Sequence, residues 1–484
     1  MIRDRLDRLP ALRRLVAHGA HGRLAGPLQP SPTAVFATLL TGRNPGRTGA
    51  FDTYRFPSGG YDRIPFDGRT VQPHAFYRRV SDEGRRVGLL NVPFLDPIPP
   101  LAGFAVSGDE GVGPEFAAPS DALAELRRIG YVVPFGASYA PGRHDAFHRH
   151  VQAVLRMQHE ALRTLFRRRP WDFGMLCLYA VGELLHAFWK FYDPRHPGHR
   201  PSAVAFGGRD PLLETLQSVD RIVAEILEFT GPDGLVIVMS AWEHRLEAER
   251  LHLNTFLHRR GLLAFRADLS TRLKRTAFRL GLGADAAERL AHRLDVYKRL
   301  HYGASRSDRA RVTGSTFLSH EDVDWSRTRA VALGYLGQIH LNVRGRRPAG
   351  TIAAEDYERF RMGLREELLD LRHPVSGDRV VERVWLREEL YSGPELEDAP
   401  ELVVECRDGI VPESGFRGGG RLVTSSPSNR SSEHSNRGFL FASGPGIRSG
   451  EVEGRLEDVA PTVLHALNVR GPSDGDGTVL DIFR

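Results

Sequence analysis

Two hydroxyl-bearing residues near the start of the chain could act as nucleophiles. Ser31 and Thr33 flank Pro32 and precede an apolar stretch, residues 34–40, that is typical of a helix. A hydroxyl is an efficient nucleophile only where a base or a metal ion lowers its pKa. Ser and Thr are also preferred N-terminal caps, because the side-chain oxygen accepts a backbone N–H bond. We expect one of the two to cap the helix, and Thr33 is the candidate nucleophile.

The turn that follows carries two arginines that could bind phosphate. Arg43 and Arg47 lie within residues 41–49, next to Gly and Pro residues. A guanidinium group matches the geometry of phosphate oxygens, and a nearby helix N-terminus would assist. A charged surface turn would have the same composition, so both interpretations stay open.

These segments and several later ones resemble the type I phosphodiesterase/nucleotide pyrophosphatase family of the alkaline phosphatase superfamily. The resemblance covers nearly the whole chain, and it implies an alkaline-phosphatase-like α/β fold: a large, mainly parallel sheet between helices. Because unrelated activities share folds, the resemblance supports fold more than activity. Its segments follow in the family's order at residues 10–19, 31–49, 88–94, 105–108, 171–178, 234–240, 324–330, 339–345 and 438–446.

The resemblance places the family's nucleophile, a Thr, Ser or Cys, at Pro32. Proline has neither a hydroxyl nor a backbone N–H. The family's members resemble two-zinc hydrolases, in which a pair of metal ions clamps the oxygens of an in-line displacement. Each ligand position therefore has to be compared separately.

The first set of ligands is half retained. An Asp-x-x-x-His motif corresponds to residues 182–186, so His186 matches whereas Gly182 replaces the Asp. Glu183 could bring a carboxylate near, although a shift of one residue usually turns a side chain away. The last ligand corresponds to His434, for which the alternative is a surface histidine in a flexible loop.

The second set of ligands is replaced. The family's Asp-His pair corresponds to Ala241 and Trp242, and neither side chain can ligate a metal. Glu243 and His244 could be that pair displaced by two residues, but the unchanged spacing to the next helix argues against a displacement. With two matched imidazoles we expect no tightly bound cofactor, since such sites normally have three or more protein ligands. Zinc or manganese is possible if the site has been rebuilt.

These replacements predict a catalytically impaired, phosphodiesterase-like pseudoenzyme. It would bind a phosphorylated small molecule or a partner protein, as a homo-oligomer or with an active relative. The alternative is an active metal-dependent hydrolase of phosphate or sulfate esters, rebuilt around Thr33, Glu183, His186, Glu243, His244 and His434. A third hypothesis is that the family's first strand, which ends in a metal-binding Asp, lies upstream of residue 1; without it the sheet would have an open slot.

Composition and charge limit the partners and the cellular location that we expect for the protein. The chain has 484 residues and a net charge of +6, with positive charge almost entirely from arginine. Because nearly as many acidic residues are interspersed, we expect no nucleic-acid partner. No apolar run approaches the ~18 residues of a membrane helix, and the chain starts with charged residues, so we expect a cytoplasmic protein without a membrane partner.

The expected organisation is one core domain with an insertion. Residues 1–265 and 320–484 would form the alkaline-phosphatase-like core, and residues 266–319 an inserted helical cap with a mobile loop. Cys177 and Cys406 lie in apolar runs and are expected to be buried free thiols.

Overall fold

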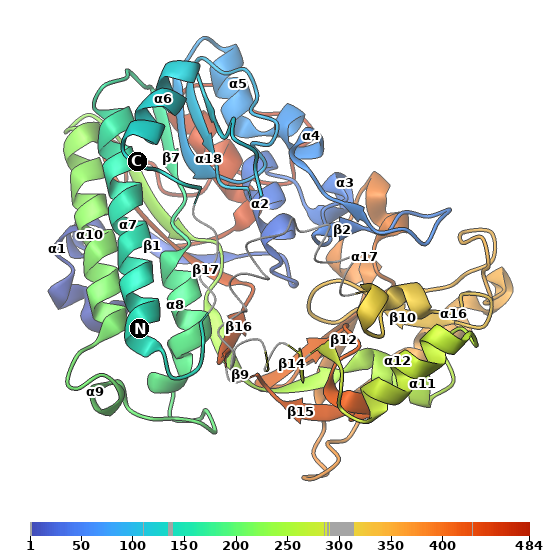
Figure 1. Cartoon of the computed structure of the whole chain (residues 1–484). Coiled ribbons are helices and arrows are strands. Elements are labelled where there is room, and N and C mark those ends of the chain that lie inside the picture. The colour runs from blue at the N-terminus through green and yellow to red at the C-terminus, as the bar shows by residue number, and fades with distance from the viewer. Residues whose placement is uncertain are drawn as a thin grey trace. The chain divides into compact units, whose positions relative to one another are not determined.

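The computed structural model describes residues 2–109, 111–133, 139–284, 286–287, 290, 314–427 and 429–484. The chain divides into two compact units (Figure 1). The first comprises Met1–Thr48, Phe66–His244 and His434–Arg484, and the second comprises Gly49–Pro65 and Arg245–Glu433. In the described ranges, no helix combines the length and the apolar character needed to cross a bilayer.

The strands of the first unit form two four-stranded ladders. Three strand pairs are parallel and three are antiparallel, so the pairing is more mixed than the mainly parallel sheet that we expected. The strand orders are β18-β1-β17-β8 and β6-β5-β4-β7. The strands are β1 (Ala20–Ala25), β4 (Val87–Val92), β5 (Gly103–Ser107), β6 (Ala117–Ala118), β7 (Phe173–Leu176), β8 (Val236–Ser240), β17 (Arg437–Ser443) and β18 (Gly450–Arg455).

β7 and β8 are outer strands of their ladders in the described part of the chain, although both border one hydrophobic core. β4 is buried along its whole length, whereas β7 and β8 are mostly half-buried. Leu176 of β7 and Val238 of β8 pack against the same cluster of buried side chains. The two ladders therefore contact the same core through their outer strands.

The helices of the first unit pack in two groups. One group contributes to the core cluster together with β4, β5 and β17, and its helices α7, α8 and α10 lie side by side in Figure 1. The second group, α2, α5 and α18, packs together. The helices of the first group are α1 (Pro10–His18), α6 (Ser120–Arg128), α7 (His144–Phe166), α8 (Ala180–Phe188) and α10 (Pro211–Thr230), and those of the second are α2 (Pro32–Thr41), α5 (Phe76–Asp82) and α18 (Val459–Ala466).

The start of α1 is stabilised from a neighbouring helix. Its own N-cap position, Leu9, has no side chain that can accept a hydrogen bond. Instead, the buried side chain of Asp220 in α10 accepts hydrogen bonds from the backbone N–H groups of Ala11 and Leu12, at 3.2 and 2.8 Å. A carboxylate at a helix N-terminus also complements the helix dipole.

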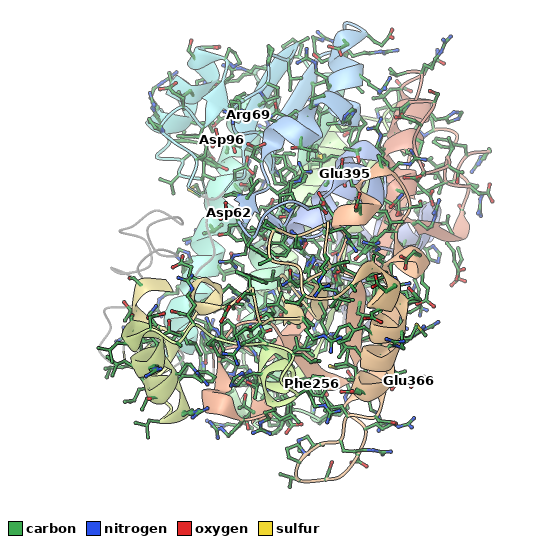
Figure 2. The ribbon with its side chains drawn as sticks, turned by 90° about the vertical axis from the view of Figure 1, so that its right-hand side faces the viewer. Asp62, Arg69, Asp96, Phe256, Glu366 and Glu395 are labelled. Atoms are coloured by element: carbon green, nitrogen blue, oxygen red, sulfur yellow. The ribbon has the colours of Figure 1, made fainter. Side chains whose placement is uncertain are left out.

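The second unit has its own strands and core. The ladders are β10-β11-β13-β12, β14-β9-β15 with β16 beside β9, and the hairpin β2-β3. In α16, Leu364 and Leu368 face the core whereas Glu366 is exposed, and Phe256 of α11 lies in the same core (Figure 2). The principal elements are β2 (Tyr54–Arg55), β3 (Ile64–Pro65), β9 (His244–His252), α11 (Leu253–Arg259), α12 (Leu269–Arg279), β10 (Ala330–Ala332), β11 (Gln338–Leu341), α16 (Tyr357–Leu369), β12 (Val381–Leu386), η6 (Pro394–Asp398), β13 (Leu402–Cys406), β14 (Gly409–Glu413), β15 (Val423–Ser425) and β16 (Ser432–His434).

The expected cap at 266–319 falls inside the second unit. Its described part includes α12, whereas residues 285, 288–289 and 291–313 lie outside the described residues, so the cap and its loop stay predictions. Cys177 and Cys406 are buried free thiols, as expected, and burial raises the pKa of both to about 12.

Candidate metal centre

Three histidines from distant parts of the sequence meet in the first unit, which includes the first residue of β9 and the last residue of β16. His186 lies in the last turn of α8, His244 is the first residue of β9, and His434 is the last residue of β16. One ring nitrogen of each lies within 4.8 Å of the others. The Nε2 atoms of His186 and His434 are 3.0 Å apart. The structure thus brings together the two histidines singled out from the sequence and adds a third.

The rings pack closely and are shielded from solvent. His434 is 7% exposed, and the other two are half-buried. The ring centroids of His186 and His244 are 4.6 Å apart in an edge-to-face arrangement. The alternative of a surface histidine in a flexible loop is therefore wrong for His434, because β16 pairs with β9 and buries it.

Gly182 faces this cluster without filling it. A Cβ atom at Gly182 would lie 3.6 Å from Nε2 of His244, which is an ordinary van der Waals distance. The position where the resemblance expects an Asp is thus adjacent to an imidazole from another strand. His244 reaches the space that a carboxylate at position 182 would enter.

Trp242 closes one side of the cluster. After β8 ends, the Ser240 hydroxyl donates a 2.6 Å hydrogen bond to the carbonyl of Trp242 and fixes the turn. The indole stacks on His434 with a centroid separation of 4.5 Å and an interplanar angle of 30°. Its other neighbour is Phe36 of α2, edge-on at 5.8 Å. The residue in the family's histidine position therefore serves aromatic packing.

The candidate nucleophile lies in the first turn of α2. Ser31 is the N-cap, and its Oγ accepts the backbone N–H of Ala34 at 3.1 Å, which confirms the capping prediction. Pro32 takes the first helical position, where its fixed φ angle and missing N–H are no disadvantage. Thr33 is 9% exposed, and its role as nucleophile stays a prediction.

The two arginines of the following turn have carboxylate partners. Nη2 of Arg43 donates to both oxygens of Asp474 at 2.8 and 2.6 Å, and Nε of Arg47 donates to Asp476 at 2.9 Å. Arg43 is also buried. These ion pairs occupy guanidinium donors that a phosphate would need, so a role in substrate binding stays a prediction.

Neither nearby glutamate belongs to the three-histidine group. Glu183 lies in the first turn of α8, and Glu243 is exposed in the turn before β9. Among the described residues, the group that could hold a metal ion consists of imidazoles alone. Glu183 as a ligand stays a prediction.

Comparison with known proteins identifies the family. The sequence model described as Type I phosphodiesterase / nucleotide pyrophosphatase matches residues 1–437. The chain belongs to this family. A search of curated proteins found no match.

Solved structures share the fold at low sequence identity. Phosphonoacetate hydrolase from Sinorhizobium meliloti 1021, in complex with phosphonoacetate, is 13% identical with a TM-score of 0.55, covering 95% of this chain and 90% of that one. Human ectonucleotide pyrophosphatase / phosphodiesterase 5 is 10% identical with a TM-score of 0.48, covering 98% and 94%. The fold is the alkaline-phosphatase-like α/β fold that the sequence indicated.

The residues present do not fit a pair of metal ions of the kind expected for the family. Pro32, Gly182, Ala241 and Trp242 offer no metal ligand, and the Trp242 ring stands against His434. No step of a two-metal displacement can therefore be assigned to these residues.

His244 is the site residue that the sequence interpretation discounted. The spacing argument treated Glu243 and His244 as a displaced pair for the second metal. His244 instead joins the first set of ligands, beside Gly182. The sequence did contain a signal for this role: Gly182 replaces an Asp ligand, and an unassigned histidine, His244, follows two residues after Trp242.

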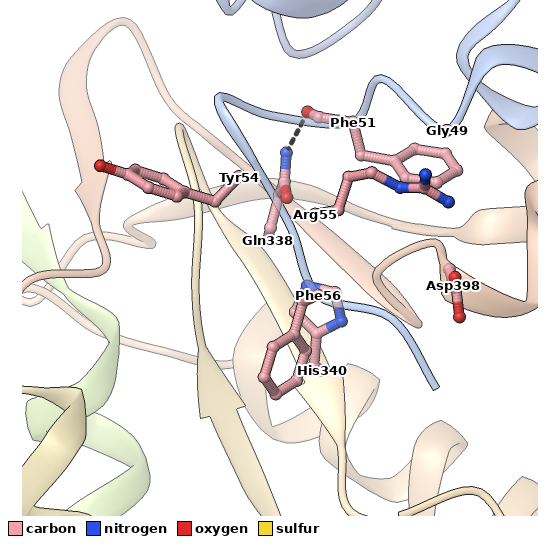
Figure 3. Close-up of a pocket in the computed structure, with 8 residues that line it drawn as sticks. All are labelled: Gly49, Phe51, Tyr54, Arg55, Phe56, Gln338, His340 and Asp398. Atoms are coloured by element: carbon pink, nitrogen blue, oxygen red, sulfur yellow. Dashed lines mark hydrogen bonds between the residues drawn. The ribbon is translucent and has the colours of Figure 1, made fainter. Parts of the chain in front are cut away.

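A pocket in the second unit is a different kind of site (Figure 3). Its polar groups already have partners: Gln338 donates to the Phe51 carbonyl at 2.8 Å, and Arg55 pairs with Glu395 at 3.1 Å. Burial and the nearby charge of Arg347 hold the pKa of His340 well below its usual value, so this imidazole is neutral. These contacts indicate a structural role for the pocket.

Proposed function

We propose that this protein is a non-hydrolytic member of the type I phosphodiesterase/nucleotide pyrophosphatase family that binds a phosphorylated small molecule without cleaving it. One observation carries the proposal: Trp242 stacks on His434 where the resemblance expects a ligand of a second metal. Together with Pro32 at the start of α2, this removes the nucleophile and one half of the metal clamp. Most transition-state stabilisation would be lost with them.

The chemistry of the cluster supports a phosphorylated ligand. Its three side chains are neutral or positive, and no carboxylate among the described residues belongs to the group. Such a site repels anions less than the carboxylate-rich one that the resemblance implies. We propose that the alternative ligand of this site is a partner protein, either a second copy of this chain or an active relative. We also propose that the protein acts in the cytoplasm.

A hydrolysis assay tests the proposal. The purified chain, with zinc or manganese supplied, is given bis-p-nitrophenyl phosphate and nucleotide p-nitrophenyl esters. We expect no turnover above that of the Thr33→Ala variant. Turnover by the wild-type chain above the uncatalysed rate would refute the proposal, and its loss in Thr33→Ala would assign the activity to Thr33.

The second candidate is an active metal-dependent ester hydrolase with a rebuilt site. The observation that favours it is the third imidazole, His244, which brings the group to the number of ligands found in catalytic zinc sites. In that case turnover would be lost in His186→Ala as well as in Thr33→Ala. Sulfate esters belong in the same assay, since the alternative includes them.

A further inference from the structure

Three imidazoles lie at a spacing close to that of a metal centre. A zinc ion with Zn–N bonds of 2.0–2.1 Å and tetrahedral angles separates its nitrogen ligands by about 3.3 Å. The Nε2 atoms of His186 and His434 are 3.0 Å apart, and all three ligand nitrogens lie within 4.8 Å of one another. Side-chain rotations that move ring nitrogens by about an ångström would bring all three to the ideal separation.

We propose that His186, His244 and His434 bind one divalent transition-metal ion, with His244 as the third ligand. Neutral imidazole nitrogens suit zinc, cobalt, nickel and copper better than magnesium or calcium, which prefer oxygen ligands. Two imidazoles alone predicted no tightly held ion from the sequence. The third imidazole changes that expectation, independently of whether the protein hydrolyses anything.

The three proposed ligands lie on three different secondary-structure elements. His186 projects from the last turn of a nine-residue helix, and the other two lie on β9 and β16, which pair with each other. A site built on a helix and two strands is better ordered than one built on loops. The contacts of Trp242 with His434 and of Trp189 with His244, with centroids 4.5 and 6.3 Å apart, further restrict the rings.

The same surroundings limit the site to one ion. The Trp242 ring covers a face of His434, and an indole offers only a donor N–H. A second ion needs its own ligands, and the group found in the described residues has three members. One ion with three imidazoles keeps a coordination position open for water or an anion.

Gly182 provides a sharp test, because its Cβ direction points toward His244. A Cβ atom there fits at 3.6 Å from Nε2 of His244, so an alanine is tolerated and an aspartate places its carboxylate at the cluster. Gly182→Asp is expected to bind the metal more tightly than wild type. Gly182→Ala fills the same space without a ligand and is its matched control.

The experiment is titration of the metal-free full chain with Co²⁺, followed by visible absorption and by elemental analysis after dialysis. We expect one cobalt per chain with the absorption bands of four- or five-coordinate cobalt. His244→Ala should weaken binding by at least about 100-fold, the upper end of what loss of an outer-shell partner costs. His18→Ala, at the exposed end of α1, is the histidine control and should bind like wild type.

Several results would overturn the proposal. Absence of cobalt bands in the folded wild-type chain would exclude the site. Wild-type affinity in His244→Ala, with binding lost in His186→Ala, would exclude His244 as a ligand. Two ions per chain would favour the two-metal interpretation. If an alanine variant fails to fold by circular dichroism, the comparison of Gly182→Asp with Gly182→Ala decides, since equal affinities would also refute the site.

The outcomes are separate from those of the proposed function. Metal binding without turnover supports both proposals. Metal binding with turnover refutes only the non-hydrolytic proposal, and absence of binding refutes only the metal centre.

Discussion

Replacing Trp242 by alanine tests whether its ring is part of the packing of the first unit. The substitution removes a stacking contact with His434 at 4.5 Å and an edge-on contact with Phe36 at 5.8 Å. Aromatic pairs contribute about 0.5–1.5 kcal/mol each, so the two together contribute about 1–3 kcal/mol. A buried Trp→Ala change costs about 3–5 kcal/mol, and a half-buried one about half of that. Both estimates are centred on a loss of about 2 kcal/mol.

The assay is urea unfolding of the wild type and of two variants, monitored by circular dichroism. Trp242→Ala should lower the free energy of unfolding of the first unit by about 2 kcal/mol. Trp242→Phe keeps an aromatic ring in contact with His434 and should lose about half as much. If Trp242→Ala unfolds at the same urea concentration as wild type, the ring is not a packing element and the argument for a filled second site fails.

Three further predictions concern other parts of the fold. Asp220→Ala should destabilise the chain by about 2–6 kcal/mol in urea unfolding, because the backbone N–H groups of Ala11 and Leu12 lose their acceptor. Asp220→Asn keeps an acceptor and should destabilise the chain less. Equal destabilisation by the two variants would contradict the capping role. Since the pKa of His340 is lowered in the folded state, its contribution to stability is present above about pH 6.5 and is lost as the pH falls below that value. Relative to His340→Gln, the free energy of unfolding of the wild type should fall by up to about 1.4 kcal/mol per pH unit. Parallel pH profiles of the two proteins would refute this prediction. Among the described residues, β7 and β8 are outer strands of their ladders, and an outer strand can pair with a second copy of the chain. We therefore expect self-association, and Ile237→Lys in β8 should lower the mass measured by light scattering. A monomeric wild type would contradict this prediction.

Sequence reasoning succeeded where the information was local or followed the order of segments. The cap at Ser31 and the helix after it depend on neighbouring residues, and the structure confirms them. The fold followed from the family resemblance, whose segments occur along the chain in the family's order. The resemblance singled out His186 and His434, and their Nε2 atoms lie 3.0 Å apart.

Partners far apart in the sequence could not be predicted. Asp474 pairs with Arg43 across 431 residues, and no local pattern marks it as the partner. His244 was misassigned because the spacing argument compared positions along the backbone with those of the family. Whether His244 joins the three-histidine group depends instead on how far its side chain extends toward His186 and His434. The absence of a side chain at Gly182 creates the space that His244 uses, and such a compensation is visible only in three dimensions.

The replacements around the cluster change its electrostatics in one direction. The resemblance implies carboxylates at Gly182 and Ala241, and their loss leaves imidazoles and an indole. A divalent ion held by three neutral imidazoles retains its full charge, whereas each carboxylate ligand would cancel one unit. Such a centre attracts a phosphate more strongly, because the local charge is more positive. In the proposed function, which lacks a hydroxyl at position 32 and a second ion, this attraction would not be coupled to bond cleavage. Retention of a metal and loss of hydrolysis are therefore compatible in one site, and together they favour a binding role.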